Sequence, residues 1–313
     1  MGQIWFRRVV KPLVGTARTR VRFSPDPPLI TFQGITEMQT IIYDTHKFSA
    51  GEINVTLATN YNPLGPDEPI CLRVTDYTAE GFMELCQVAE ILRRLYDNPK
   101  IWVEYPYFPF SRQDRVMEKS PRQSFSLKVF ANLLNSQGFD KVITWDPHSS
   151  VTPALINNVE VINQDYFVYF IPELWAKLED PDTVIVAPDA GAYKKVVGMA
   201  KDPNKVVVAT KIRGADGSIS HTEILNGTDL EGKSCVIIDD ICDGGRTFIG
   251  IAEALKARGA NKYEIDLFVT HGIFSRGADC LIDAGIDTIY TTNSFPATDC
   301  GNVNVLSYSA FQE

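Results

Sequence analysis

Several features that would define a protein class are missing from this sequence. No stretch reaches the roughly 18 continuous apolar residues that a membrane-spanning helix needs. The six cysteines are scattered with no C-x-x-C pair, which excludes a disulfide framework or a zinc site and indicates reduced thiols in the cytoplasm. We find no internal repeat and no low-complexity tract. The 313 residues, 44% hydrophobic, are enough for two domains or one large one.

Positive charge is also scarce outside the N-terminus. The chain carries a formal charge of −9, but residues 1–37 hold six Arg and Lys against two acids, which leaves −13 on the rest. This balance argues against a nucleic-acid or membrane partner and suits an enzyme whose substrates are metal-bound anions. The basic leader, followed by "SPDPP", fits a transit peptide. We expect instead a disordered extension or sequence foreign to the native protein, so the predicted fold begins at Met38.

From Met38 onwards the pattern alternates apolar strands with amphipathic helices. Strands that are apolar throughout indicate parallel sheets covered by helices on both faces, and two such series predict two α/β domains, at 38–164 and 165–313. In the first series we expect strands at 53–58, 69–74, 100–107 and 141–146, with helices at 79–96 and 124–138. The second series runs through 183–189, 193–200, 205–211, 234–240, 248–259, 264–271, 278–285 and 288–293.

The segment "VIIDDICDGGRTF", residues 236–248, carries the strongest chemical signal. We expect the strand to end at Asp239 and Asp240, and the next residues to turn the chain into a helix that Thr247 caps. Ligands of open α/β sheets sit beyond the carboxyl ends of strands, and a helix N-terminus binds anions. Two acids at such a place are costly without a ligand or metal. The segment therefore predicts a pocket for a phosphorylated sugar.

A second glycine-rich motif is misleading. Residues 227–234, "GTDLEGKS", satisfy the phosphate-loop pattern G-x-x-x-x-G-K-S. A working phosphate loop follows a strand and opens a helix, whereas this segment precedes a strand and has Asp229 and Glu231 where phosphates would lie. We interpret it as a connecting turn.

Several segments together resemble the ribose-phosphate diphosphokinases, also called PRPP synthetases. They occur in family order at family-like spacing: "KFSAGEINVTL" (47–57), "YPYFPFSRQDR" (105–115), "DPHSS" (146–150), "APDAGA" (187–192), 236–247, and "THGIFSRGA" (270–278). The resemblance implies two phosphoribosyltransferase-like domains and transfer of the β,γ-diphosphate of ATP to the C1 hydroxyl of ribose 5-phosphate, giving PRPP and AMP.

The resemblance also assigns roles to single residues. His148 and Asp189 match metal-contacting positions, which implies Mg²⁺ with ATP as co-substrate. Lys211 and Arg213, in the segment 209–221 that we interpret as a mobile lid, match the K-x-R pair that stabilises the diphosphate during transfer, and His148 joins them in the catalytic set. The resemblance implies that the sugar phosphate is bound by a further set of residues: Asp239, Asp240, Asp243, Gly244, Gly245, Arg246 and Thr247.

For the nucleotide, the resemblance implies contacts from two segments. These residues are Phe48, Glu52, Arg112, Gln113 and Asp114. The segment with Phe48 comes from a neighbouring subunit in the family, which implies a homo-oligomer. Ala50 stands where the family has Asp, so one adenine acceptor is missing.

The 5-phosphate loop departs from the family pattern D-T-G-G-T. Gly244 replaces a Thr that binds phosphate, and Arg246 replaces a Gly. An Arg adds charge and reach but crowds a tight cradle, which favours a longer 5′ group. One alternative is therefore the same transfer to a 5′-substituted ribose such as ADP-ribose.

Two further alternatives stay open. A phosphoribosyltransferase would share the acidic loop but has no need of "SRQDR" or His148. An inactive regulatory subunit of a PRPP synthetase would bind nucleotide without turnover, although Lys211, Arg213, His148 and Asp189 are all retained.

Overall fold

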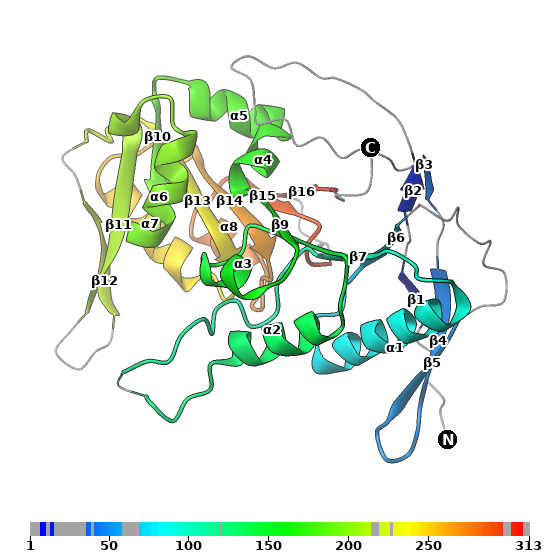
Figure 1. Cartoon of the computed structure of the whole chain (residues 1–313). Coiled ribbons are helices and arrows are strands. Elements are labelled where there is room, and N and C mark those ends of the chain that lie inside the picture. The colour runs from blue at the N-terminus through cyan, green and yellow to red at the C-terminus, as the bar shows by residue number, and fades with distance from the viewer. Residues whose placement is uncertain are drawn as a thin grey trace. The chain divides into compact units, whose positions relative to one another are not determined.

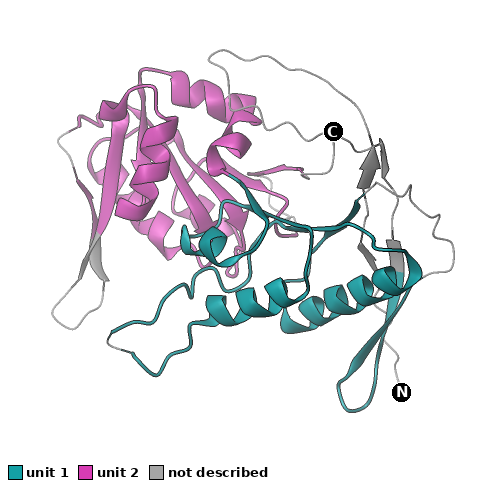
Figure 2. Ribbon diagram, viewed as in Figure 1, with its two compact units in different colours: residues 1–162, 309–313 teal, residues 163–308 magenta. Residues whose placement is uncertain are grey.

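A computed structural model describes residues 7–10, 13–15, 36–38, 41–57, 69–118, 120–213, 219–225, 228–296 and 302–308, with backbone only for those before 43 and for those from 211 to 221. The described residues form two compact units that separate between Ile162 and Asn163, against a predicted boundary at 164 (Figure 2). Each unit is described by itself.

Unit 1 is built on a four-stranded parallel sheet, in the order β6-β7-β8-β9 (Figure 1). An antiparallel hairpin of β4 and β5, with β1 along its other edge, forms a second sheet. The elements are β1 (Arg7–Val10), β2 (Leu13–Gly15), β3 (Thr36–Met38), β4 (Ile41–Lys47), β5 (Ile53–Leu57), β6 (Ile70–Arg73), α1 (Ala79–Leu95), β7 (Ile101–Tyr105), α2 (Ser126–Ser136), β8 (Lys141–Trp145), α3 (Val151–Leu155) and β9 (Val159–Ile162).

Helix α1 illustrates how the sequence sets these elements. The Thr78 hydroxyl caps its first turn by accepting from the Gly81 amide, and Arg93 and Arg94 lie in the last turn, where they complement the helix dipole. Its apolar face packs into a core shared with the sheet and with the hairpin residues Tyr43 and Val55. The hairpin is thus part of the hydrophobic core of unit 1.

Unit 2 contains a seven-stranded sheet in the order β12-β11-β10-β13-β14-β15-β16, parallel except for β12. Its elements are α4 (Gln164–Tyr169), α5 (Pro172–Glu179), β10 (Thr183–Ala187), α6 (Ala190–Met199), the 3₁₀ helix η1 (Pro203–Lys205), β11 (Val206–Arg213), β12 (Ile219–Leu225), β13 (Ser234–Cys242), α7 (Arg246–Ala257), β14 (Ile265–Gly272), α8 (Asp279–Asp283), β15 (Ile289–Thr292) and β16 (Val303–Leu306).

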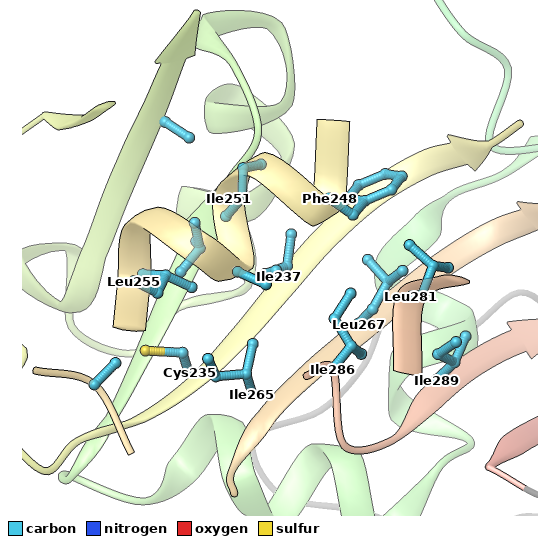
Figure 3. Packing of buried hydrophobic residues seen from close by; sticks show 14 of the residues in the cluster. Cys235, Ile237, Phe248, Ile251, Leu255, Ile265, Leu267, Leu281, Ile286 and Ile289 are labelled. Carbon is cyan, nitrogen blue, oxygen red and sulfur yellow. The ribbon is translucent and has the colours of Figure 1, made fainter. Parts of the chain in front are cut away.

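The core of unit 2 lies between the sheet and helices α7 and α8. Figure 3 shows Phe248, Ile251 and Leu255 of α7 facing Ile237 of β13 and Leu267 of β14, all nearly inaccessible to solvent. Burial of such side chains stabilises the fold by roughly 1.5–3 kcal/mol each. The prediction of α/β units with mainly parallel sheets is confirmed.

Three predictions concern the N-terminal leader, the glycine-rich motif and membrane-spanning helices. Strands β1 and β2, and the start of β3, fall within residues 1–37; the remaining residues of that stretch lie outside the described ones, so its nature stays a prediction. The segment at 228–233 is a turn that leads into β13, which confirms the rejection of the phosphate-loop motif. No helix among the described residues is long and apolar enough to cross a membrane.

Candidate active site

The acid pair lies on β13, the central strand of unit 2. The prediction that this strand ends at Asp240 is wrong, because β13 continues to Cys242. The extension has a partner on one side, where β14 pairs as far as Gly272, whereas pairing with β10 stops at Ile237. Asp239 and Asp240 therefore lie past the last residue that pairs with β10, in a part of β13 that still pairs with β14. Their rigid backbone is typical of a preorganised binding site.

The two carboxylates repel each other. Burial raises the pKa of Asp239 well above its ordinary value, and the negative charge of Asp240 adds to this, with a smaller contribution from Asp189. The Asp239 backbone carbonyl accepts a 2.6 Å hydrogen bond from the side-chain amide nitrogen Nε2 of Gln164, which holds the backbone in place. Protonation of Asp239, or a hydrogen bond from a ligand to it, relieves the repulsion between the two carboxylates. The pair therefore favours ligands that donate hydrogen bonds, such as sugar hydroxyls.

The loop after β13 turns at Gly245, the N-cap of α7. Gly245 has φ 74°, and a Cβ there would lie 3.0 Å from a Leu281 methyl, so the turn requires glycine. The predicted cap by Thr247 is wrong: Thr247 lies inside the helix, and the N-cap makes no side-chain hydrogen bond. The helix begins at Arg246, two residues earlier than predicted, because the chain already turns at the left-handed Gly245. The N-terminus of this 12-residue helix thus faces the loop, as an anion site requires.

The turn after β14 fastens this loop. The amides of Ile273 and Phe274 donate to the Cys242 carbonyl, at 2.9 and 3.1 Å. The Ser275 amide donates to the Asp243 carbonyl at 3.1 Å, and its hydroxyl donates to Asp243 Oδ1 at 2.6 Å. Sequence reasoning assigned no role to Ser275, although it lies in the matched segment 270–278. It is a positioning group for Asp243.

Two exposed arginines flank the loop. Arg246 is the first residue of α7, and Arg276 follows the fastening turn. A Cβ on Gly244 would lie 3.3 Å from Arg276 Cδ, so the Arg276 side chain occupies the space beside this glycine. The sequence pointed only to Arg246. Within the described part of unit 2, neither guanidinium has a carboxylate partner within salt-bridge distance, so both can meet an anion.

Asp189 lies two residues beyond Ala187, where β10 ends. It is the N-cap of α6, and its Oδ1 accepts from the amides of Gly191 and Ala192 at 2.7 and 2.9 Å. The carboxylate is exposed and held in one orientation by these two bonds. A fixed, exposed carboxylate suits a cation ligand.

The predicted loop at 209–221 is shorter than expected, while its role as a mobile lid stays a prediction. Lys211 and Arg213 belong to β11, which pairs antiparallel with β12. Pairing continues because both segments are rich in β-branched residues, with a register shift between Ile212 and Arg213. The side chains of both basic residues and the tip at 214–218 lie outside the described residues.

In unit 1, the structure brings Asp114 and His148 into one cluster. Asp114 is almost fully buried and accepts two hydrogen bonds from Arg115, at 2.8 and 3.1 Å. Burial favours its neutral form, but hydrogen bonds from Arg115 and Ser149 and the charges of Arg115 and His148 outweigh it and lower the pKa of Asp114. Asp114 thus joins the loop of Arg112 and Gln113, both exposed, to the loop of His148.

Backbone strain marks the same loops. Phe110 and Phe274 adopt φ of 61° and 45°, a left-handed conformation that is unfavourable for bulky side chains. Asp146, two residues before His148, has φ 35°. Such residues persist where the surrounding structure fixes them, and they concentrate at functional sites. Phe110 stands two residues before Arg112, and Phe274 fastens the acidic loop.

Phe48 and Glu52 lie at the turn of the β4–β5 hairpin. The Phe48 amide donates to the Glu52 carbonyl at 2.8 Å and closes the turn. Phe48 is 50% exposed, and its ring packs only edge-on against His46, with centroids 4.6 Å apart, among the described residues. An exposed phenylalanine at a turn is not a core residue, so this side chain is accessible to a ligand or partner.

The possible metal ligands in each unit are few. They contain no group of three or more His, Cys, Asp or Glu side chains able to hold a metal ion by themselves. Mg²⁺ bound to a nucleotide keeps water and phosphate ligands and needs only one or two protein carboxylates. The donor set at Asp189 fits such an ion, whereas a cage made entirely of protein ligands does not.

Comparisons with known proteins agree with this arrangement. Residues 33–138 match the N-terminal domain of ribose phosphate pyrophosphokinase, and residues 173–288 match the phosphoribosyl transferase domain. The fold resembles a phosphoribosylpyrophosphate synthetase from Mycobacterium smegmatis, with a TM-score of 0.69 at 24% identity, over 84% of this chain and 85% of that one. The chain is therefore an enzyme of the class that combines a pyrophosphokinase-type N-terminal domain with a phosphoribosyl transferase domain.

Sequence relatives narrow the class. The ribose-phosphate pyrophosphokinase of Vibrio cholerae is 32% identical over 91% of this chain and 93% of its own length. Those of Haemophilus ducreyi and Chromobacterium violaceum are 32% and 31% identical over 84% of this chain, covering 83% and 80% of their own lengths. The chain belongs to the ribose-phosphate pyrophosphokinase family, which confirms the predicted resemblance.

Proposed function

We propose that this enzyme transfers the β,γ-diphosphate of ATP to the C1 hydroxyl of ribose 5-phosphate. The observation that carries this assignment is the cluster of Asp114 with His148 in unit 1, in a chain that also has the acid pair of unit 2. A phosphoribosyltransferase needs only the second of these sites.

The acceptor binds to unit 2. Asp239 and Asp240 accept hydrogen bonds from the ribose hydroxyls, which relieves their mutual repulsion. The 5-phosphate lies on the amides of the loop from Asp243 to Thr247, at the positive end of α7. Both contacts fix the sugar, so the C1 oxygen is held in place for attack.

The chemical step is a displacement at phosphorus. The C1 oxygen attacks Pβ of ATP, the bond from Pβ to the bridging oxygen of AMP breaks, and the proton of the C1 hydroxyl leaves to solvent or a base. Lys211 and Arg213 stabilise the charge on the diphosphate, while Arg112, Gln113 and Asp114 hold the nucleotide. The chemistry is mostly positioning and electrostatics, so no covalent intermediate on the protein is needed.

Mg²⁺ is the implied cofactor. Asp189 in unit 2 and His148 in unit 1 are the residues that would each supply a ligand, and the ion would neutralise the charge of the phosphate oxygens when bound. We further propose a homo-oligomer, because Phe48 and Glu52 are accessible on the hairpin, and a cytoplasmic location, because the described cysteines are all free thiols.

A second acceptor is favoured by a specific observation. Arg246 and Arg276 flank the loop, and Gly244 leaves the space that Arg276 fills. Two guanidinium groups suit a 5′-diphosphate ester better than a single phosphate. The same transfer to ADP-ribose is therefore the second candidate.

The test is AMP release by the purified protein from ATP and Mg²⁺, with ribose 5-phosphate and ADP-ribose offered separately. Faster turnover of ribose 5-phosphate supports the first candidate, and a preference for ADP-ribose supports the second. Nucleotide binding without AMP from either acceptor would instead indicate a regulatory subunit.

A further inference from the structure

Helix α1 presents a polar stripe to the β4–β5 hairpin. Glu80, Glu84 and Gln87 are spaced by four and three residues, so they share one face of the helix. Each of them bonds to the hairpin, and together they meet both of its strands. Figure 1 shows the hairpin running beside α1 with its turn extending past the helix.

Gln87 substitutes for a neighbouring strand. Its Oε1 accepts from the Val55 amide at 2.8 Å, and its Nε2 donates to the Ile53 carbonyl at 3.0 Å. In the described part of unit 1, β5 is the edge of its sheet, in the order β1-β4-β5. The side-chain amide therefore pairs two backbone groups that an edge strand otherwise leaves to solvent.

Glu84 holds the other strand. Its carboxylate accepts from the Tyr43 hydroxyl at 3.0 Å and from the Thr45 hydroxyl at 3.2 Å. Glu84 is only 5% exposed, and a carboxylate at that depth requires such donors. Nearer the turn, Lys47 pairs with Glu80 at 2.5 Å.

These contacts end where Phe48 and Glu52 begin. Among the described residues, the turn itself is closed by two local backbone bonds, from the Phe48 amide to the Glu52 carbonyl and from the Gly51 amide to the Phe48 carbonyl. The direction of the turn is therefore set by how the two strands dock on α1. We infer that Glu84 and Gln87 are positioning residues that hold Phe48 and Glu52 in place for the adenine of the diphosphate donor. The inference rests on the proposed function, in which these two residues contact the nucleotide.

The experiment compares Gln87→Met with the wild-type protein. Methionine keeps the length of the side chain and loses both hydrogen bonds. We expect amide exchange at 53–57 to accelerate and the KM for ATP to rise about tenfold, because a small misplacement of binding groups is costly. The KM for the acceptor and kcat should change less than about twofold, since unit 2 is untouched.

A second variant guards against misfolding. Tyr43→Phe keeps the buried ring and removes only the hydroxyl bonded to Glu84, so it should raise the KM for ATP by a smaller factor. Glu90→Gln is the control: Glu90 lies on the same helix and pairs with the exposed Arg94, an interaction of little energetic weight. It should leave exchange and both KM values unchanged.

Two results would overturn the inference. One is faster exchange in Gln87→Met with an unchanged KM for ATP; the other is an equal rise in both KM values together with a fall in kcat. If the wild-type protein releases no AMP, the proposed function fails. In that case the Kd of ATP is compared between the wild-type protein and Gln87→Met. A tenfold higher Kd in the variant supports the positioning role, and equal Kd values refute it.

Discussion

The Ser275 hydroxyl donates a 2.6 Å hydrogen bond to Oδ1 of Asp243, which joins the turn after β14 to the loop after β13. The same turn makes three backbone bonds to that loop. The orientation of Asp243 is therefore fixed by a segment about thirty residues further along the chain. Such buttressing holds a binding loop without touching the substrate.

Ser275→Ala should weaken acceptor binding. Loss of a hydrogen bond to a carboxylate costs about 1.5 kcal/mol, or roughly tenfold in the KM for the acceptor. The KM for ATP should stay the same, and Ser275→Thr should restore the acceptor value because it keeps the hydroxyl. Steady-state kinetics with each substrate varied would test this, and a rise confined to ATP would contradict it.

Asp239→Asn should stabilise the ligand-free protein while abolishing most of its activity. The pKa of Asp239 is raised in the folded state, so its stabilising contribution is complete below the unfolded value of about 3.9 and is lost as pH rises through the folded pKa. Removing the charge should raise Tm at pH 8, by about 3 °C per kcal/mol, and not at pH 3. Thermal scans at both pH values provide the check; a lower Tm at pH 8 would refute the repulsion argument.

Asp114→Asn should have the opposite pH dependence. The pKa of Asp114 is lowered in the folded state, so its contribution is present above the unfolded pKa and disappears as pH falls through the folded value. We expect a loss of about 1–2 kcal/mol at pH 7, and none at pH 2. Urea unfolding at the two pH values measures the difference, and Asp182→Asn, at an exposed ion pair with Lys233, is the control. Equal destabilisation at both pH values would exclude an ionic role for Asp114.

The predicted strands and helices follow from local periodicity, whereas α3, β9, α4, α5, β12 and β16 had no predicted counterpart. Periods of two and 3.6 residues are visible in single segments such as those of β10 and α1. The chemical segments were recognisable together, since each is a short contiguous motif and they occur in one order along the chain. These features need no knowledge of tertiary contacts.

The misplaced features depend on contacts between distant segments. The end of β13 is decided by the length of β14, and the pairing of Lys211 with Thr222 by the register of β11 on β12. The roles of Ser275 and Gln87 are set by partners 32 residues away. No periodicity within a segment carries such information.

Lys211→Ala tests the charge stabilisation of the diphosphate. Removing one such group from a transition state costs on the order of 10²–10³ in kcat. Lys211→Arg should recover part of the rate, because it keeps a positive charge at this position of β11. Lys201→Ala is the matched control, since Lys201 pairs with Glu179 at the surface of the same unit. A change in KM alone, with kcat intact, would assign Lys211 to ground-state binding.

We expect the acceptor preference to depend on Arg246 and Arg276. If both meet a second phosphate on the 5′ side, Arg246→Ala and Arg276→Ala should each lower kcat/KM for ADP-ribose about tenfold or more, the cost of a charge-assisted hydrogen bond. The value for ribose 5-phosphate should stay within about threefold. Arg246→Lys keeps the charge but loses the bidentate hydrogen-bond geometry, so its kcat/KM for ADP-ribose should lie between those of the wild-type protein and Arg246→Ala. Equal losses with both acceptors would place the arginines on the phosphate that the two substrates share, and the second candidate would then lose its support.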